Sequence, residues 1–110
     1  MLLAGCGGDG GGEQAAGECT PGTSGQTVTV CMKDIKYMPA DAKVPVGGKV
    51  VWPNADQVPH TVTKEAGPGP DFDSGTVPGG GNFEQTFPEA GTIEYVCTIH
   101  PSQKGTLTVE

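Results

Sequence analysis

Turn-forming residues divide the sequence after residue 26 into segments about ten residues long, and this spacing constrains the fold more than any other feature. The clearest turns are Gly47-Gly48, Pro53-Asn54, Gly79-Gly80-Gly81 and Ala90-Gly91. Val and Thr alternate between these turns with the period of two that is typical of a half-buried strand. The 19 Gly and 10 Pro among these 110 residues argue against long helices. We therefore predict an all-β domain, an antiparallel sandwich or barrel of seven to eight short strands.

The expected strands are short. They cover residues 26–32, 34–37, 42–46, 49–52, 61–64, 82–87, 92–97 and 105–109. Trp52, Phe83, Phe87 and Tyr95, together with the valines, are expected to form the core between the sheets. Residues 65–78, rich in Gly, Pro and Asp, are predicted to form one long loop.

The first 25 residues differ in composition from the rest of the sequence. They are mostly Gly, Ala, Glu, Thr and Ser, and they cannot bury enough apolar surface to offset the entropy lost on ordering. We predict a flexible tether over residues 1–25 and one folded domain over residues 26–110. The net charge of −7 argues against nucleic-acid binding, which needs clustered Lys and Arg. An acidic surface serves either solubility or attraction of a basic partner.

The sequence has four cysteines, and the roles that we predict for the first three indicate an exported protein. Cys6 follows Leu3-Ala4-Gly5, which resembles the lipobox of bacterial lipoproteins and predicts lipidation of Cys6, although a chance match in a Gly-rich leader stays open. The sequence has no apolar stretch of 18 residues, so the predicted membrane link is this lipid anchor alone. Cys19 and Cys31 are predicted to form a disulfide, which needs an oxidising compartment, so we expect a periplasmic or other extracytoplasmic location. Two unpaired thiols remain the alternative, because sequence spacing does not show how closely the two Cα atoms approach.

The fourth cysteine belongs to a segment with metal-ligand spacing. Cys97 ends a predicted strand, His100 follows three residues later, and Gln103 follows three residues after that. His60, the only other histidine, lies in an upstream turn that an antiparallel fold can bring alongside. Two imidazoles and a thiolate with a weak axial ligand are the donor set of a blue copper site. We therefore predict copper ligands at His60, Cys97 and His100, with Gln103 in the axial position.

From Thr27 to Glu110 the sequence resembles a cupredoxin, and it is most similar to the amicyanin and plastocyanin-like group. The matching segments are Val44-Pro45-Val46-Gly47, Val50-Val51-Trp52-Pro53-Asn54, Pro59-His60, Ala90-Gly91-Thr92 before Tyr95, and Cys97-Thr98-Ile99-His100-Pro101. This resemblance implies a Greek-key β-sandwich with one type 1 copper. It also implies a monomeric electron carrier, not an enzyme, that meets protein redox partners transiently.

Three positions depart from the amicyanin-like pattern. Gln103 stands where that pattern has Met, as in the stellacyanin-like branch, and an amide oxygen should stabilise Cu(II) and lower the reduction potential. Ile99 stands where Pro is frequent, and its N–H is available to donate to the Cys97 sulfur and raise the potential. Thr61 replaces an Asn that ties the two ligand loops together, and whether a hydroxyl does the same is left open.

The resemblance also implies an electron exit at the surface beside His100. The apolar residues expected to frame this exit are Met38, Val58, Pro59, Ile99 and Pro101.

Other functions make different demands on the sequence. A structural zinc site usually has closely spaced cysteine pairs, which Cys97 lacks, yet a copper- or zinc-binding module with a storage or structural role remains an alternative. Oxidases and nitrite reductases of related families need a second copper centre, with histidines flanking the type 1 cysteine. Here Val96 and Thr98 flank Cys97. A purely structural sandwich would not explain the ligand spacing.

Overall fold

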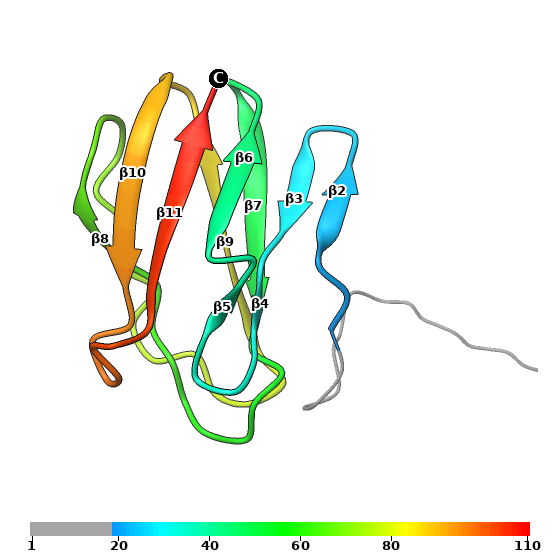
Figure 1. Cartoon of the computed structure of the whole chain (residues 1–110), viewed down its shortest axis with the longest axis vertical. Helices are drawn as coiled ribbons and strands as arrows, with labels where there is room; N and C mark the ends of the chain where they lie inside the picture. The colour runs from blue at the N-terminus through cyan, green and yellow to red at the C-terminus, as the bar shows by residue number, and fades with distance from the viewer. Residues whose placement is uncertain (1–18) are drawn as a thin grey trace, which may run out of the picture.

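The computed structural model describes residues 19–110 as two four-stranded sheets packed face to face, with a short hairpin at one end (Figure 1). One sheet has the order β6-β11-β10-β8 and the other the order β2-β3-β7-β9, while β4 and β5 form the hairpin. The strands are β2 (Gly22–Ser24), β3 (Thr27–Thr29), β4 (Cys31–Met32), β5 (Tyr37–Met38), β6 (Asp41–Val44), β7 (Gly48–Pro53), β8 (Thr63–Ala66), β9 (Asn82–Phe87), β10 (Gly91–Val96) and β11 (Lys104–Val109). The all-β prediction is confirmed. Within these residues no helix is long and apolar enough to cross a membrane.

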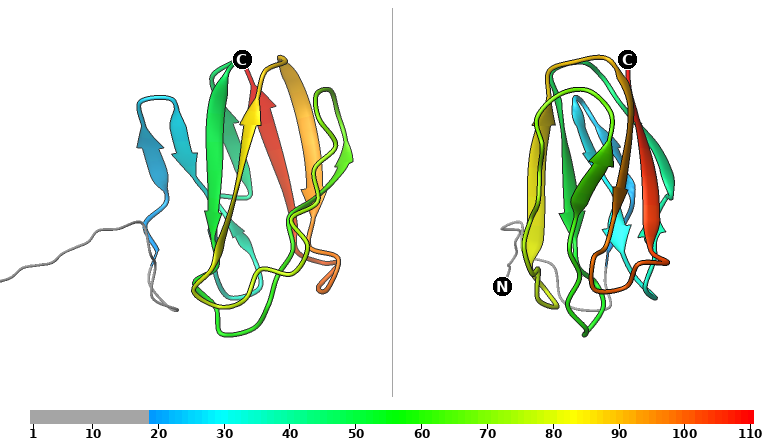
Figure 2. Two further views of the ribbon diagram at one scale, coloured as in Figure 1. Left: turned by 180° about the vertical axis from the view of Figure 1, so that it is seen from behind. Right: turned by 90° about the vertical axis from the view of Figure 1, so that its left-hand side faces the viewer.

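The sandwich is not purely antiparallel as the sequence predicted. β3 pairs with β7 in parallel, and β6 pairs with β11 in parallel. Both pairs arise because the backbone switches sheets between β3 and β6 and again between β6 and β7. Figure 2 shows the two layers edge on, with the long connection after β8 closing one side.

Two details near the N-terminus of the domain differ from prediction. β2 lies within residues 1–25, where a tether was predicted, and pairs with β3 through its backbone. The strand predicted over residues 34–37 is wrong, because Asp34 and Ile35 both have φ of 57° and form a tight turn that leads into β5. A β-branched residue rarely adopts this left-handed conformation, so contacts outside the turn must stabilise it. Residues 1–18, including the predicted lipidation site Cys6, lie outside the described residues.

The core is built around Trp52, which is fully buried on β7. Its ring packs against Tyr95 at 5.4 Å and Phe87 at 6.3 Å between ring centroids, and also against Phe83 at 5.8 Å. Phe72 comes from the loop predicted over residues 65–78 and is likewise buried, 6.0 Å from Trp52. This connection therefore covers the open side of the sandwich and contributes to its core.

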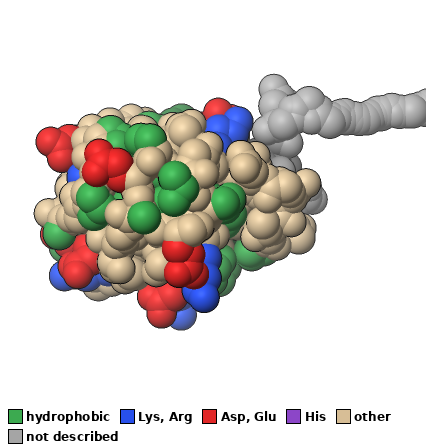
Figure 3. Space-filling view, turned by 90° about the horizontal axis from the view of Figure 1, so that it is seen from above, with side chains coloured by type: hydrophobic (Ala, Val, Ile, Leu, Met, Phe, Trp, Pro, Cys, Tyr) green, Lys and Arg blue, Asp and Glu red, His purple; other side chains and the backbone are tan. Residues whose placement is uncertain are grey.

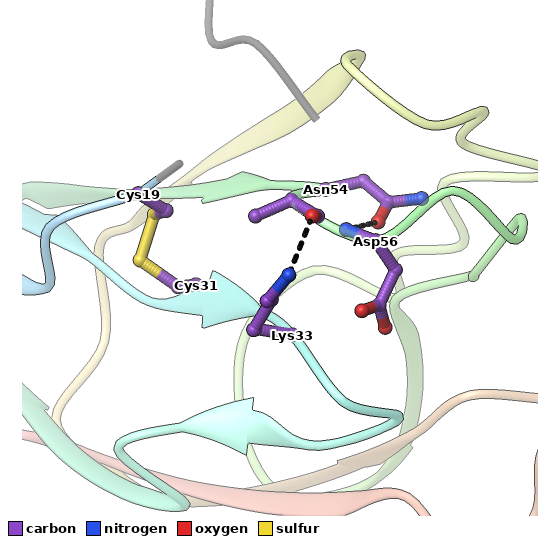
Figure 4. Close-up of a disulfide and its surroundings, with 6 residues drawn as sticks. Cys19, Cys31, Lys33, Asn54 and Asp56 are labelled. Atoms are coloured by element: carbon purple, nitrogen blue, oxygen red, sulfur yellow. Dashed lines mark hydrogen bonds between the residues drawn. A yellow bond between two sulfur atoms is a disulfide. The ribbon is translucent and has the colours of Figure 1, made fainter. Parts of the chain in front are cut away.

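Cys19 and Cys31 form the predicted disulfide, with their Cα atoms 5.9 Å apart. Cys31 is buried at the start of β4, and Cys19 precedes β2, so the bridge closes a covalent loop that contains β2 and β3 (Figure 4). The two unpaired thiols considered from the sequence are thereby excluded.

Replacing both cysteines with alanine is expected to lower the free energy of unfolding by about 3 kcal/mol, because a loop of this length no longer restricts the unfolded state. Guanidinium denaturation of the wild-type and double-variant proteins measures the difference. Wild-type protein under reducing conditions is the control and should match the double variant. Equal midpoints for oxidised wild type and variant would contradict this prediction.

Candidate metal centre

Three side chains with metal-binding atoms converge at one end of the sandwich. The Cys97 sulfur lies 3.8 Å from Nδ1 of His60 and 3.7 Å from Nδ1 of His100. The three donor atoms lie within 4.8 Å of one another. Cys97 and His60 are fully buried, whereas the His100 ring is partly exposed. The end opposite these loops, seen in Figure 3, presents hydrophobic, acidic and basic side chains, and no histidine is visible there.

Cys97 and His100 are held by a closed loop between β10 and β11. The Cys97 N–H donates to the Gln103 carbonyl at 3.0 Å, and the Gln103 N–H donates to the His100 carbonyl at 2.8 Å. Gly105, the second residue of β11, pairs with Tyr95, and a Cβ at this position would clash with the tyrosine ring. Glycine at position 105 therefore lets the loop pack directly on the aromatic core.

His60 reaches the same place from the connection between β7 and β8. Its backbone exchanges two hydrogen bonds with Val77, at 3.1 and 2.7 Å, in an isolated β-bridge. The fully buried Asn54 shapes the preceding turn, because its amide donates to the carbonyls of Val58 and Val77 and its oxygen accepts the Asp56 N–H. Every polar atom of this amide has a partner, which fixes the path of the backbone before His60.

Asp56 holds the far side of the His60 ring. Its Oδ2 lies 2.7 Å from His60 Nε2, so Nε2 carries the proton and Nδ1 is left free to face Cys97. The same carboxylate accepts hydrogen bonds from the N–H groups of Asp34 at 2.7 Å and Ile35 at 3.0 Å. Figure 4 shows the Asp56 side chain. Burial disfavours the charged form, but the hydrogen bonds from Ile35, His60 and Asp34 outweigh it, and the pKa of Asp56 is lowered. Asp56 thus stabilises the left-handed turn as well as the histidine.

The two ligand loops are tied directly to each other. The Thr61 N–H donates to the Cys97 sulfur at 3.3 Å, and the Thr61 hydroxyl accepts the Thr98 N–H at 2.8 Å. A threonine hydroxyl therefore links the loops where the amicyanin-like pattern has Asn. Among the described residues the donor to the sulfur is Thr61, and the Ile99 N–H considered from the sequence makes no such bond.

Gln103 has a buried side chain beside this loop. It is 2% exposed, and neither its amide oxygen nor its amide nitrogen has a hydrogen-bond partner among residues 19–110. An unpaired buried amide costs about 1–3 kcal/mol, which binding of its oxygen to a metal ion would offset. This unpaired side chain is the observation that favours an axial role for Gln103.

Tyr37 and Asp56 support the site but were not predicted from the sequence. The Tyr37 hydroxyl donates to the Thr61 carbonyl at 2.6 Å, and its ring packs 4.6 Å from Tyr95. Burial is the largest cause that raises the pKa of Tyr37, so Tyr37 remains a protonated donor. A carboxylate four residues before a ligand histidine is a signal that could have identified Asp56.

The residues predicted to frame an electron exit differ in exposure. Val58 and Ile99 are 41% and 42% exposed, Pro59 and Pro101 are also exposed, and Met38 is half-buried. Ile99 and Pro101 directly flank the partly exposed His100 in sequence.

The donor set fits a single transition-metal ion. With metal–sulfur bonds of about 2.3 Å and metal–nitrogen bonds of about 2.0–2.1 Å, ligands around one ion lie roughly 3.5–3.8 Å apart, close to the sulfur–nitrogen distances found here. Two imidazoles and a thiolate in a closed, mostly buried site suit copper of the type 1 class.

Comparison with known proteins agrees with this geometry. Residues 25–110 match the model of the copper binding proteins of the plastocyanin/azurin family. The chain belongs to this family. Among its cupredoxin relatives, amicyanin-alpha of Methylorubrum extorquens is 31% identical over 78 residues, which cover 69% of this chain and 66% of the relative. Amicyanin of Paracoccus denitrificans is 33% identical over 90 residues, which cover 76% of this chain and 65% of the relative.

Solved cupredoxin structures share the fold. A Cu(I) amicyanin in which a methionine is replaced by glutamine has a TM-score of 0.72 at 32% identity, over 79% of this chain and 85% of the other. A purple cupredoxin from Nitrosopumilus maritimus has a TM-score of 0.66 at 30% identity, over 76% of this chain and 98% of the other. The chain spans slightly less than two thirds of the length of the two amicyanins compared by sequence.

Proposed function

We propose that this cupredoxin carries single electrons between protein partners, with one copper held by His60, Cys97 and His100. The convergence of two Nδ1 atoms on one buried thiol carries this proposal. When bound, copper supplies one-electron exchange between Cu(II) and Cu(I). The protein's part is to hold the ligands in nearly one geometry for both oxidation states.

Rigidity at the ligands comes from bonds that do not depend on the metal. Asp56 fixes the ring of His60, and Val77 fixes its backbone. Thr61 ties the His60 segment to Cys97, while Gln103 closes the loop through Cys97 and His100. The ligands should therefore move little when the copper gains or loses an electron. This rigidity favours an electron carrier over a storage protein.

Gln103 completes this proposal as an axial oxygen ligand, similar to the stellacyanin-like branch. Oxygen is a harder donor than the thioether of methionine and stabilises Cu(II) relative to Cu(I). The N–H donated by Thr61 to the Cys97 sulfur acts in the opposite direction, because it withdraws electron density from the thiolate.

Gln103→Met is expected to raise the Cu(II)/Cu(I) potential, because a soft thioether favours the reduced ion. Cyclic voltammetry of both proteins measures the change. Gln85→Met is the control, since Gln85 lies half-buried on β9 in the other sheet and should leave the potential unchanged. A potential that does not rise in Gln103→Met would contradict the axial role.

Partners would reach the copper through the partly exposed His100. The apolar frame of Met38, Val58, Pro59, Ile99 and Pro101 supports brief contact, since weak redox encounters use small interfaces. We propose that the protein works as a monomer and not as an enzyme. The Cys19–Cys31 disulfide supports an extracytoplasmic, periplasmic location, and attachment there through a lipid on Cys6 belongs to the same proposal.

The visible and EPR spectra of the protein loaded with Cu(II) test the function. An intense thiolate-to-copper absorption with narrow hyperfine splitting is expected. Rapid electron self-exchange, followed by NMR line broadening in mixtures of the two oxidation states, separates a carrier from a copper storage module. A pale, ordinary cupric spectrum would overturn the proposal, and a site that retains only zinc would support the alternative metal-binding role.

A further inference from the structure

Three threonine hydroxyls lie in series beside the copper ligands and end at a surface carboxylate. The Thr98 and Thr61 hydroxyl oxygens are 3.1 Å apart, and the Thr61 and Thr63 hydroxyl oxygens are also 3.1 Å apart. Thr63 then donates to Oδ1 of Asp73 at 3.3 Å. Thr61 is buried, Thr63 is half-buried, and both Thr98 and Asp73 are exposed. The series thus runs from the ligand loop to the connection after β8.

The carboxylate fixes the direction of every bond in the series. An ionised carboxylate only accepts, so the single hydroxyl proton of Thr63 is committed to Asp73. Thr61 must then donate to Thr63, and Thr98 must donate to Thr61. The Thr61 oxygen consequently accepts from the hydroxyl and the N–H of Thr98 and donates once, which uses its full hydrogen-bonding capacity.

The saturated hydroxyl of Thr61 lies at the junction of the two ligand loops. Its own residue donates a backbone N–H to the Cys97 sulfur, and it accepts the N–H of Thr98, which immediately follows Cys97. We propose that Thr63 and Asp73 are positioning residues of the copper centre, which act through Thr61 to fix the N–H donated to the Cys97 sulfur and the start of the ligand loop. Within residues 19–110, neither residue forms a hydrogen bond to a ligand side chain.

This inference gives a role to the connection over residues 65–78 beyond its contribution to the core. Asp73 forms an isolated β-bridge with Thr63, and its Oδ1 also accepts the Gly75 N–H at 3.0 Å. Next to it, the Ser74 hydroxyl accepts the Val62 N–H at 2.7 Å. The connection therefore fastens the segment that carries Thr61 at two adjacent points.

The inference deepens the proposed function, but its first test needs no copper. In the metal-free protein, Thr63→Val removes the acceptor of the Thr61 hydroxyl while keeping a β-branched side chain of similar shape. Hydrogen exchange of the Thr98 amide, followed by NMR, is expected to become about fivefold faster. An increase of this size corresponds to a partial weakening of the hydrogen bond from the Thr98 N–H to the Thr61 hydroxyl. Thr29→Val, at a half-buried threonine of β3, is the matched control and should leave the Thr98 amide unchanged.

Two variants of Asp73 separate its role as acceptor from its charge. Asp73→Asn keeps an oxygen that accepts from Thr63 and should leave Thr98 exchange close to wild type, whereas Asp73→Ala should match Thr63→Val. Unchanged Thr98 exchange in both Thr63→Val and Asp73→Ala would overturn the inference. Equal acceleration in Asp73→Asn and Asp73→Ala would overturn it as well, because the acceptor would then be irrelevant.

The Cu(II) protein provides a second readout. Thr63→Val is expected to shift the thiolate-to-copper absorption band, and Thr29→Val is not. If wild type shows the band and Thr63→Val leaves it unmoved, this inference fails while the proposed function stands. If wild type shows no such band, the proposed function fails, and amide exchange still decides whether the hydroxyl series positions Thr61.

Discussion

Cys97→Ser is expected to abolish the intense visible absorption of the Cu(II)-loaded protein. That absorption requires transfer of electron density from a thiolate sulfur to the metal, and a serine hydroxyl is neither ionised near neutral pH nor a soft donor. The EPR hyperfine splitting should widen at the same time to that of ordinary cupric sites. Absorption and EPR spectra recorded at equal copper loading measure both changes.

The control for this substitution is the variant with alanine at both Cys19 and Cys31. Those cysteines are bonded to each other, whereas Cys97 is the one free thiol among residues 19–110. The double-alanine variant should therefore keep the full absorption despite its lower stability. Colour that persists in Cys97→Ser would show that Cys97 does not bind copper.

Asp56→Ala is expected to have the second large effect, this time on both stability and redox behaviour. Removing a buried carboxylate leaves His60 Nε2 and the N–H groups of Asp34 and Ile35 without their acceptor. A buried N–H donor left without an acceptor costs about 1–3 kcal/mol, which urea denaturation of the metal-free proteins would detect. The Cu(II)/Cu(I) potential should rise, because a histidine that no longer donates to a carboxylate is a weaker electron donor.

Asp56→Asn refines this test. An asparagine presents one oxygen and one NH₂ group, and the NH₂ group would face an N–H donor instead of accepting from it. The loss of stability should therefore lie between wild type and Asp56→Ala. Asp41→Ala, at an exposed carboxylate that begins β6, is the control and should change neither quantity appreciably. A potential that is unchanged in both Asp56 variants would contradict the role assigned to this carboxylate.

The sequence predicted those parts of the site that depend on short-range spacing. Cys97, His100 and Gln103 lie within seven residues, so one loop carries them whatever the rest of the protein does. The structure places the predicted His60 beside Cys97 and His100 and shows why Gln103 is distinctive, since its buried amide has no partner among residues 19–110. The disulfide could also be predicted, because Cys19 and Cys31 lie close in sequence and an exported protein would occupy an oxidising compartment.

The residues that support the ligands could not be predicted, because their contacts depend on tertiary structure. Asp56 reaches Asp34 and Ile35 only because these residues adopt a left-handed turn, whereas the local alternation of polar and apolar residues suggested a strand. Tyr37 reaches the Thr61 carbonyl across the sandwich. The edge strand β2 was missed for a different reason, since it pairs through its backbone and exposes all three side chains.

The Cys19–Cys31 bridge determines how the domain would respond to mechanical force. A pull applied at Cys19 passes through the covalent bond to Cys31 on β4 and bypasses residues 20–30. The weakly buried edge strand β2 and its partner β3 are thus spared the load, although they are the first strands of the described residues. Under such a pull, the copper end of the sandwich would bear tension through β4, whose Met32 bridges to Asn54 in the turn that presents His60.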